Sequence, residues 1–220
     1  MGATLRPVWL PAAWRRIVAG MNDKSRLAVI VGSVRDGRFG PVIASWVAER
    51  ARQHGAFDVD VIDLADTEIP LSLPTMSPKA AGENYPRPAV LGPVTARLAA
   101  ADAFLMVTPE YNHSYPAVLK ALIDWHFTQW AAKPVAFACY GGEIAGGRHA
   151  VLHLENVLIE LDAVPIRAGL AFSRPFTTWE DGAPLDADAA GRAKELLERL
   201  AWWADALRAA RATAPFPGAA

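Results

Sequence analysis

The densest group of hydrogen-bonding side chains lies at residues 108–114, which read TPEYNHS. An apolar run ends just before them, and an apolar pattern of helical period follows from Val118 to Ile123. This order predicts a strand, a loop and a helix, with Ser114 as a candidate N-cap and Pro116 in the first turn. Open α/β sheets bind ligands at the loops that follow the carboxyl ends of their strands. We therefore expect this loop to bind a planar, polar molecule.

A second loop with binding chemistry, residues 32–40 (GSVRDGRFG), lies between an apolar run and a helical pattern. At such a position, backbone N–H groups and a helix N-terminus face an anion. The Ser33 hydroxyl and the guanidinium groups of Arg35 and Arg38 add phosphate donors. Because the loop lacks both the Walker A Lys-Ser/Thr pair and a dinucleotide fingerprint, a single terminal phosphate fits better than a pyrophosphate. A glycine-rich turn with solvated arginines is the alternative.

The third loop, residues 140–148 (YGGEIAGGR), contains four glycines. Glycine allows positive φ and a close approach of the backbone to a ligand. A flexible turn before a helix is the alternative explanation. The coincidence of three such loops, each after an apolar run, favours a shared binding site.

The elements that position these loops are five apolar runs of strand length, which alternate with five helical patterns. This alternation predicts an α/β fold, a doubly wound parallel sheet with helices on both faces. In the flavodoxin-like strand order 2-1-3-4-5, the three loops meet at one edge. A long Pro-rich connection such as that over residues 65–92 usually has a function or covers a neighbouring surface. The strands are expected at 27–31, 57–64, 103–107, 134–140 and 164–172, and the helices at 41–54, 88–101, 114–125, 148–161 and 186–210.

The composition is that of one globular domain: 220 residues, 52% hydrophobic, 20% charged, with a net charge of -1. This charge gives no reason to expect nucleic acid or a membrane surface as a partner. Neither a signal-peptide core nor an apolar run of about 18 residues is present, and we expect a cytoplasmic protein. We expect a single domain at residues 23–212 and a flexible tail at 213–220. Residues 1–22 are expected to be an N-terminal extension or disordered, with an Arg-rich interaction arm as the alternative.

Other groups of reactive residues carry weaker signals. The single cysteine, Cys139, lies in an apolar run, which favours a buried, unreactive thiol. His149 and His153 have the i, i+4 spacing of metal ligands, but no third ligand is placed, so we expect no metal site. His113 next to Ser114 lacks the Gly-x-Ser-x-Gly elbow of a hydrolase.

Several of these segments resemble the NADPH-dependent FMN reductase family, a flavodoxin-like group that includes quinone, azo-dye and chromate reductases. The resemblance spans about residues 25–175 and implies a flavodoxin-like fold, bound FMN and reduction of a small acceptor by NAD(P)H. It also implies a homodimer or tetramer with each flavin near a subunit interface. The matching phrases are GSVR at 32–35, TPEYNHS at 108–114, LK at 119–120, IDW at 123–125 and YGG at 140–142.

The resemblance also implies roles for individual residues. The chain departs from the common family pattern at Ala121, where Asn is usual, and at the Arg38-Phe39 pair, near which Ser or Thr is usual. Tyr111 and His113 are expected to shape the pocket for nicotinamide and acceptor. The FMN phosphate is assigned to Ser33, Arg35, Arg38, Phe39 and Gly40, the isoalloxazine and ribityl chain to Pro109, Glu110, Tyr111 and Asn112, and the polar edge of the ring to Gly141 and Gly142.

The expected reaction passes a hydride from nicotinamide C4 to flavin N5 and then electrons to a quinone, flavin, azo compound or chromate. Because the cofactor carries this chemistry, no side-chain nucleophile or general acid is expected. A non-catalytic flavin-binding or redox-sensing module is the main alternative. A one-electron carrier of flavodoxin type is disfavoured, because no strongly acidic surface is evident.

Overall fold

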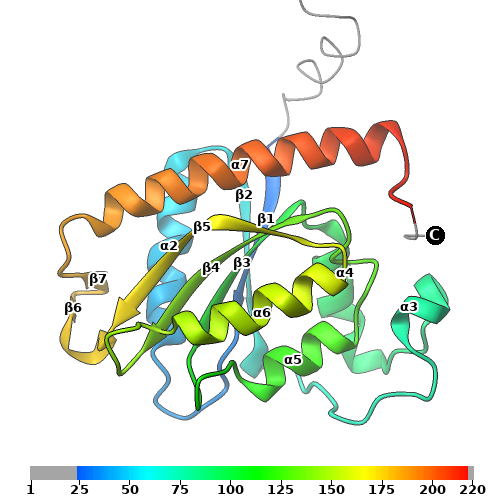
Figure 1. Cartoon of the computed structure of the whole chain (residues 1–220), viewed down its shortest axis with the longest axis horizontal. Coiled ribbons are helices and arrows are strands. Elements are labelled where there is room, and N and C mark those ends of the chain that lie inside the picture. The colour runs from blue at the N-terminus through cyan, green and yellow to red at the C-terminus, as the bar shows by residue number, and fades with distance from the viewer. Residues whose placement is uncertain (1–23, 218–220) are drawn as a thin grey trace, which may run out of the picture.

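The computed structural model describes residues 24–217, so the predictions for residues 1–22 and 218–220 lie outside the described residues. Five parallel strands form one sheet in the order β2-β1-β3-β4-β5, which confirms the predicted flavodoxin-like fold (Figure 1). The strands are β1 (Ser25–Val31), β2 (Phe57–Asp63), β3 (Ala103–Pro109), β4 (Pro134–Gly141) and β5 (Val164–Ser173).

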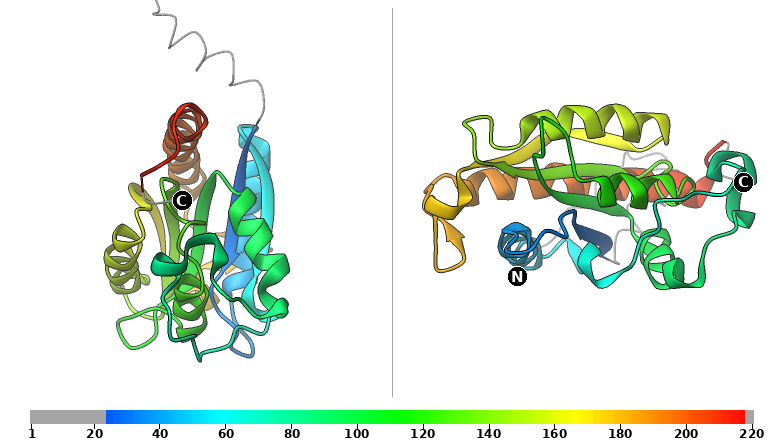
Figure 2. Two further views of the ribbon diagram at one scale, coloured as in Figure 1. Left: turned by 90° about the vertical axis from the view of Figure 1, so that its right-hand side faces the viewer. Right: turned by 90° about the horizontal axis from the view of Figure 1, so that it is seen from below.

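Helices cover both faces of the sheet (Figure 2). One face packs against α2 (Gly40–His54) and α7 (Ala189–Thr213). The other packs against α4 (Gly92–Ala100), α5 (Ala117–Asp124) and α6 (Arg148–Glu160). The described residues contain no helix with the length and apolar content that a bilayer span requires.

The two faces explain the unbroken apolar runs of the sequence. Along β1, Leu27, Val29 and Val31 join the core beneath α2 and α7. The alternate residues Ala28 and Ile30 join the core beneath α4, α5 and α6. Because successive side chains of a strand point to opposite faces, a strand buried on both sides must be apolar at every position.

The start of α5 differs from the prediction. Ser114 is not its N-cap, because the helix begins at Ala117 and Pro116 occupies the cap position without a side-chain hydrogen bond. The backbone of Ser114 instead pairs with Tyr111 in both directions, at N–O distances of 2.9 and 2.8 Å. A tight turn therefore takes up the residues that the sequence pattern assigned to the first helical turn.

A short hairpin after β5 was not predicted. It consists of β6 (Trp179–Glu180) and β7 (Ala183–Pro184) and projects beyond the end of β5 (Figure 1). The Trp179 ring packs edge-on against Phe39, Trp46 and Phe172, with centroid distances of 5.6, 5.8 and 5.1 Å. The hairpin is thereby fixed to the loop between β1 and α2.

The long connection after β2 contains a short helix, α3 (Pro78–Ala81), and covers the end of α5. Trp125 Nε1 donates a hydrogen bond to the Pro70 carbonyl at 2.7 Å, and Arg87 Nε donates to the Trp125 carbonyl at 2.8 Å. Tyr85 packs against the Trp125 ring. This is the arrangement expected of a connection that covers a neighbouring surface.

Candidate active site

The loops after β1, β3 and β4 meet in one pocket of about 310 Å³ at the carboxyl edge of the sheet. The pocket brings together every predicted cofactor residue except Gly40 and Asn112. It also includes residues that the sequence reasoning did not select. Its lining residues are Ser33, Arg35, Asp36, Gly37, Arg38, Phe39, Pro109, Glu110, Tyr111, Tyr140, Gly141, Gly142, Pro175 and Phe176.

Ser33 joins the first and second loops. Its side chain is buried, and its Oγ lies 2.9 Å from the Tyr111 hydroxyl, so one of the two hydroxyls donates to the other. Gly40 opens α2 behind this pair, where a Cβ would lie 3.0 Å from the Tyr140 hydroxyl. A larger residue at position 40 would therefore push the helix N-terminus away from the pocket.

The two arginines of the first loop have different surroundings. Arg38 donates to the Asp63 carboxylate at 2.6 Å and to the Ser33 carbonyl at 2.9 Å. The hydrogen bond that Arg38 donates to Asp63 is the largest cause of the raised pKa of Arg38. The Arg35 side chain is exposed and makes no hydrogen bond or ion pair with any of residues 24–217, although the Arg35 carbonyl accepts a hydrogen bond from the backbone N of Arg38 at 3.2 Å. Arg38 therefore braces the loop against the end of β2, whereas the guanidinium of Arg35 is available to a phosphate.

The second loop is a two-residue turn with an unusual backbone. Asn112 and His113 have φ values of 51° and 63°, in the left-handed region. A turn with positive φ at both central residues favours Asn followed by Gly. Histidine at the second position is strained, and strain of this kind concentrates at functional sites. The turn holds His113 on the exposed side of the loop.

Glu110 lines the pocket and also connects the end of β3 to the start of α6 through hydrogen bonds. Its backbone N donates to the Tyr140 carbonyl at 2.9 Å. Its carboxylate accepts hydrogen bonds from the backbone N of His149 at 3.1 Å and from His149 Nδ1 at 2.9 Å. The carboxylate therefore satisfies donors at the N-terminus of α6, where negative charge is favourable.

Two glycines of the third loop allow its backbone to pack closely against β4, where a side chain would not fit. At Gly147, with φ of 91°, a Cβ would lie 2.6 Å from the backbone N of Tyr140. At Gly141 a Cβ would lie 3.2 Å from the backbone N of Gly147. A Cβ on Gly142 would have no neighbour within 4 Å. The loop is closed against β4 at Gly141 and Gly147, and its backbone at Gly142 is open toward a ligand.

Sequence reasoning missed Pro175 and Phe176, which follow β5 and complete the pocket. Phe176 is 72% exposed, and its ring lies 5.2 Å from that of Phe39. Neither residue belongs to a motif with known chemistry. The only available signal was the recurrence of aromatic residues at Phe172, Phe176 and Trp179.

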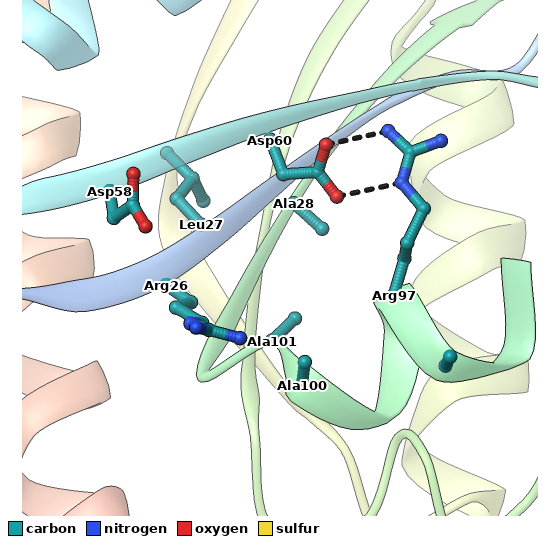
Figure 3. A pocket seen from close by; sticks show the side chains of 9 residues that line it. Arg26, Leu27, Ala28, Asp58, Asp60, Arg97, Ala100 and Ala101 are labelled. Atoms are coloured by element: carbon teal, nitrogen blue, oxygen red, sulfur yellow. Dashed lines mark hydrogen bonds and ion pairs between the residues drawn. The ribbon is translucent and has the colours of Figure 1, made fainter. Parts of the chain in front are cut away.

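Two other features do not contribute to the site. Cys139 is buried, and burial raises the pKa of its thiol to about 12, which agrees with an unreactive cysteine. A second cavity of about 390 Å³ lies at the amino-terminal ends of β1 and β2 (Figure 3). Among the described residues, it shares no lining residue with the pocket formed by the three loops. In this second cavity, the guanidinium of Arg97 donates two hydrogen bonds, of 2.6 and 2.8 Å, to the carboxylate of Asp60. The two charged groups are thus already paired with each other.

The pocket fits FMN on three observations. The exposed guanidinium of Arg35 and the N-terminus of α2 are groups that can hold an anion at one end. The buried hydroxyl of Ser33 provides a further polar contact. The open backbone at Gly142 can face the polar edge of a planar ring.

Comparison with known proteins agrees with this geometry. Residues 25–177 match the model of a family described as NADPH-dependent FMN reductase. The chain belongs to the NADPH-dependent FMN reductase family. It is accordingly an oxidoreductase whose cofactors are FMN and NAD(P)H. An NAD(P)H-dependent FMN reductase of Schizosaccharomyces pombe is 33% identical over 155 residues, which cover 68% of this chain and 74% of the relative.

Two further relatives and one solved structure are similar to this FMN reductase family member. A quinone reductase of Escherichia coli is 30% identical, covering 66% of this chain and 74% of the relative. A 2-hydroxy-1,4-benzoquinone reductase of a Burkholderia species is 33% identical, covering 63% and 73%. The solved structure of the flavoenzyme FerB, an NAD(P)H:acceptor oxidoreductase of Paracoccus denitrificans, has a TM-score of 0.63 and 23% identity, covering 83% of this chain and 98% of FerB.

Proposed function

We propose that this protein transfers reducing equivalents from NAD(P)H to a small acceptor, with quinones as the leading acceptor class. The observation that carries the proposal is the convergence of the three loops in one pocket that can bind FMN. Bound FMN would supply the redox chemistry, taking a hydride from nicotinamide C4 at its N5 and passing electrons to the acceptor. The protein would bind FMN and orient it toward nicotinamide and the acceptor.

At the phosphate end, we assign direct contact to Ser33, Arg35 and the N-terminus of α2 at Gly40. The positive end of the helix favours an anion, as does the guanidinium of Arg35, which has no partner among residues 24–217. Arg38 holds the loop in place through Asp63. Phe39 packs against Phe176 and Trp179, which fixes the outer side of the same loop.

At the ring end, Pro109, Glu110 and Tyr111, which line the pocket, would line one side of the isoalloxazine and the ribityl chain, and Asn112, outside the pocket lining, would reach them from the adjoining turn. The backbone at Gly141 and Gly142 would approach the polar edge of the ring, where N–H donors stabilise negative charge that develops on reduction. Tyr111 and His113 would shape the space that nicotinamide and acceptor occupy in turn. No side-chain nucleophile is required.

The choice of quinones rests on the relatives, since two of them are named as quinone and 2-hydroxy-1,4-benzoquinone reductases. An open pocket formed by short loops also suits flat acceptors of varied structure. Free flavin, azo compounds and chromate are the other acceptors to compare.

The decisive experiment is an absorbance spectrum of the purified full chain after addition of FMN and desalting. Bands near ~375 and ~450 nm that NADPH or NADH bleaches without oxygen, and that a benzoquinone restores, would support the proposal. Arg35→Ala should lower FMN retention, whereas Arg26→Ala, at the opposite edge of the sheet, should not. A flavin that stays bound but is not bleached by either nucleotide would indicate a binding or sensing module instead.

We also propose a homodimer and a cytoplasmic location. Leu152 and Ile159 on α6 are 58% and 62% exposed, and seven residues of spacing place them on one helix face. Leu152→Glu should convert a dimer to a monomer in light scattering coupled to size-exclusion chromatography. Trp202→Glu, a matched change of an exposed side chain on α7, should leave the mass unchanged. A cytoplasmic location suits a single, buried cysteine.

A further inference from the structure

Three residues with metal-binding side chains meet beside the pocket. Glu110 follows the end of β3, His113 lies in the adjacent turn, and His149 lies in the first turn of α6. One donor atom from each lies within 4.8 Å of the other two. The two imidazole rings stack, with centroids 4.3 Å apart and planes within 10° of parallel. His149, which follows His113 by 36 positions, thus joins Glu110 and His113 in one cluster.

Backbone contacts hold these residues in place. Glu110 is fixed by the hydrogen bond from its N to the Tyr140 carbonyl. The paired backbone of Tyr111 and Ser114 fixes the turn that bears His113, whose φ of 63° is costly outside glycine. His149 is held by the helix and by the Glu110 carboxylate. Glu110, His149 and the backbone that bears His113 are therefore held in place, and the exposed His113 side chain is the part of the cluster that has to move.

The other three histidines of the chain, His54, His126 and His153, lie outside the cluster. His153 Nδ1 lies 3.1 Å from Ser114 Oγ, so His149 and His153 have different partners despite their i, i+4 spacing. Buried His126 uses both ring nitrogens, with Thr95 and the Leu122 carbonyl. His54 lies at the end of α2, outside the cluster. The spatial grouping, and not the helical spacing, defines the candidate ligands.

Two imidazole nitrogens and one carboxylate oxygen match the donor set of a three-ligand zinc site with one open position. We infer that Glu110, His113 and His149 bind one divalent transition metal ion, of the Zn²⁺ class, at the mouth of the pocket. The ion takes the place of the proton that Glu110 and His149 share across 2.9 Å. Because the lone pairs of two stacked rings do not converge on one ion, the exposed His113 side chain would have to turn out of the stack for its nitrogen to face the ion.

The electrostatics of the cluster depend on Glu110. The N-terminus of α6 and the exposed side chain of Arg148 are both positive and oppose a cation. The Glu110 carboxylate, only 10% exposed, offsets them with a charge that can coordinate the ion directly. Since Glu110 also lines the pocket, a bound ion would place positive charge next to it and favour anionic ligands there.

The test is titration calorimetry of the tag-free full chain with Zn²⁺ in a non-chelating buffer, first without FMN. The expected result is one Zn²⁺ per chain, with protons released on binding. His113→Ala and His149→Ala should each weaken binding at least as much as loss of an outer-shell partner does, which is about 10- to 100-fold. His153→Ala is the matched control and should bind as the unchanged chain does.

Cobalt provides an independent readout, since Co²⁺ in a site with nitrogen and oxygen ligands absorbs visible light and each histidine variant should alter that spectrum. Equal Zn²⁺ binding by the unchanged chain, His113→Ala and His149→Ala would overturn the inference, as would the absence of stoichiometric binding. Urea unfolding of each variant confirms that it is folded. The inference does not rest on flavin binding, because Zn²⁺ and FMN are titrated separately and either can fail alone.

Discussion

Glu110 accepts two hydrogen bonds from a single residue, His149, one from the backbone N at 3.1 Å and one from the ring Nδ1 at 2.9 Å. This relationship ties the end of β3 to the start of α6 across 39 residues of sequence. It also means that one carboxylate serves a helix terminus, a histidine and the wall of the pocket.

Replacement of Glu110 should therefore lower stability. Glu110→Ala removes a charged acceptor from a helix N-terminus, which costs about 1–2 kcal/mol of unfolding free energy. Glu110→Gln retains an acceptor and should cost less. Urea unfolding monitored by circular dichroism measures both, with exposed Glu143→Ala in the third loop as control. Equal stability of Glu110→Ala and the unchanged chain would show that the contact contributes nothing.

The two arginines of the first loop should separate binding from loop stability. Arg35→Ala should weaken FMN binding about 10- to 100-fold without changing stability, because a hydrogen bond to a charged group is worth roughly 1.5–3 kcal/mol. Arg38→Met should lower both affinity and stability, since it leaves Asp63 unpaired. Fluorescence titration with FMN and urea unfolding give the two quantities. The assignment fails if Arg35→Ala binds FMN normally while only Arg38→Met loses affinity.

Replacement of two glycines of the third loop by alanine should affect stability differently. Gly147→Ala places a Cβ against the backbone of Tyr140 at a positive φ and should cost about 3 kcal/mol or more. Gly142→Ala has open space and should retain the stability of the unchanged chain. Thermal unfolding compares them directly. A stable Gly147→Ala protein would mean that the loop can adopt another path.

His126 should make the protein sensitive to acid. Burial lowers the pKa of its imidazole from 6.5 to about 4. Nδ1 donates to the Leu122 carbonyl, so Nε2 of the neutral ring accepts from the Thr95 hydroxyl. Because the folded-state pKa lies below the unfolded value, the stability is present above pH 6.5 and is lost as the pH falls toward 4.

The measurement is the unfolding free energy of the unchanged chain and of His126→Gln at pH 7 and pH 5. The unchanged chain should lose about 2 kcal/mol more than the variant over this interval. Parallel pH profiles for the two proteins would exclude His126 as the titrating group. Exposed His153→Gln serves as a control that should follow the unchanged chain.

The sequence by itself determined the order of the elements and the chemistry of the three loops. The apolar runs that became β1, β3 and β4 are continuous because those strands are buried on both faces, and that pattern is local. The glycines and polar residues after each run are also local signals. Together with strand–helix alternation, they predicted a doubly wound parallel sheet with a binding site at the three loops. The flavodoxin-like strand order and the individual pocket residues came from the family resemblance of these segments.

The tertiary structure alone decided which side chains meet. Nothing near Arg38 in the sequence points to Asp63, and nothing near Glu110 points to His149, because these contacts depend on how neighbouring strands and helices are placed. The segment after β5 that carries Phe176, and the hairpin that follows it, are held at the pocket by aromatic packing of Phe176 and Trp179 against Phe39, which is distant in sequence. The periodicity of apolar residues shows which positions of a strand or helix are buried. Contacts between side chains that are distant in sequence depend on how the elements pack, which no short stretch of sequence specifies.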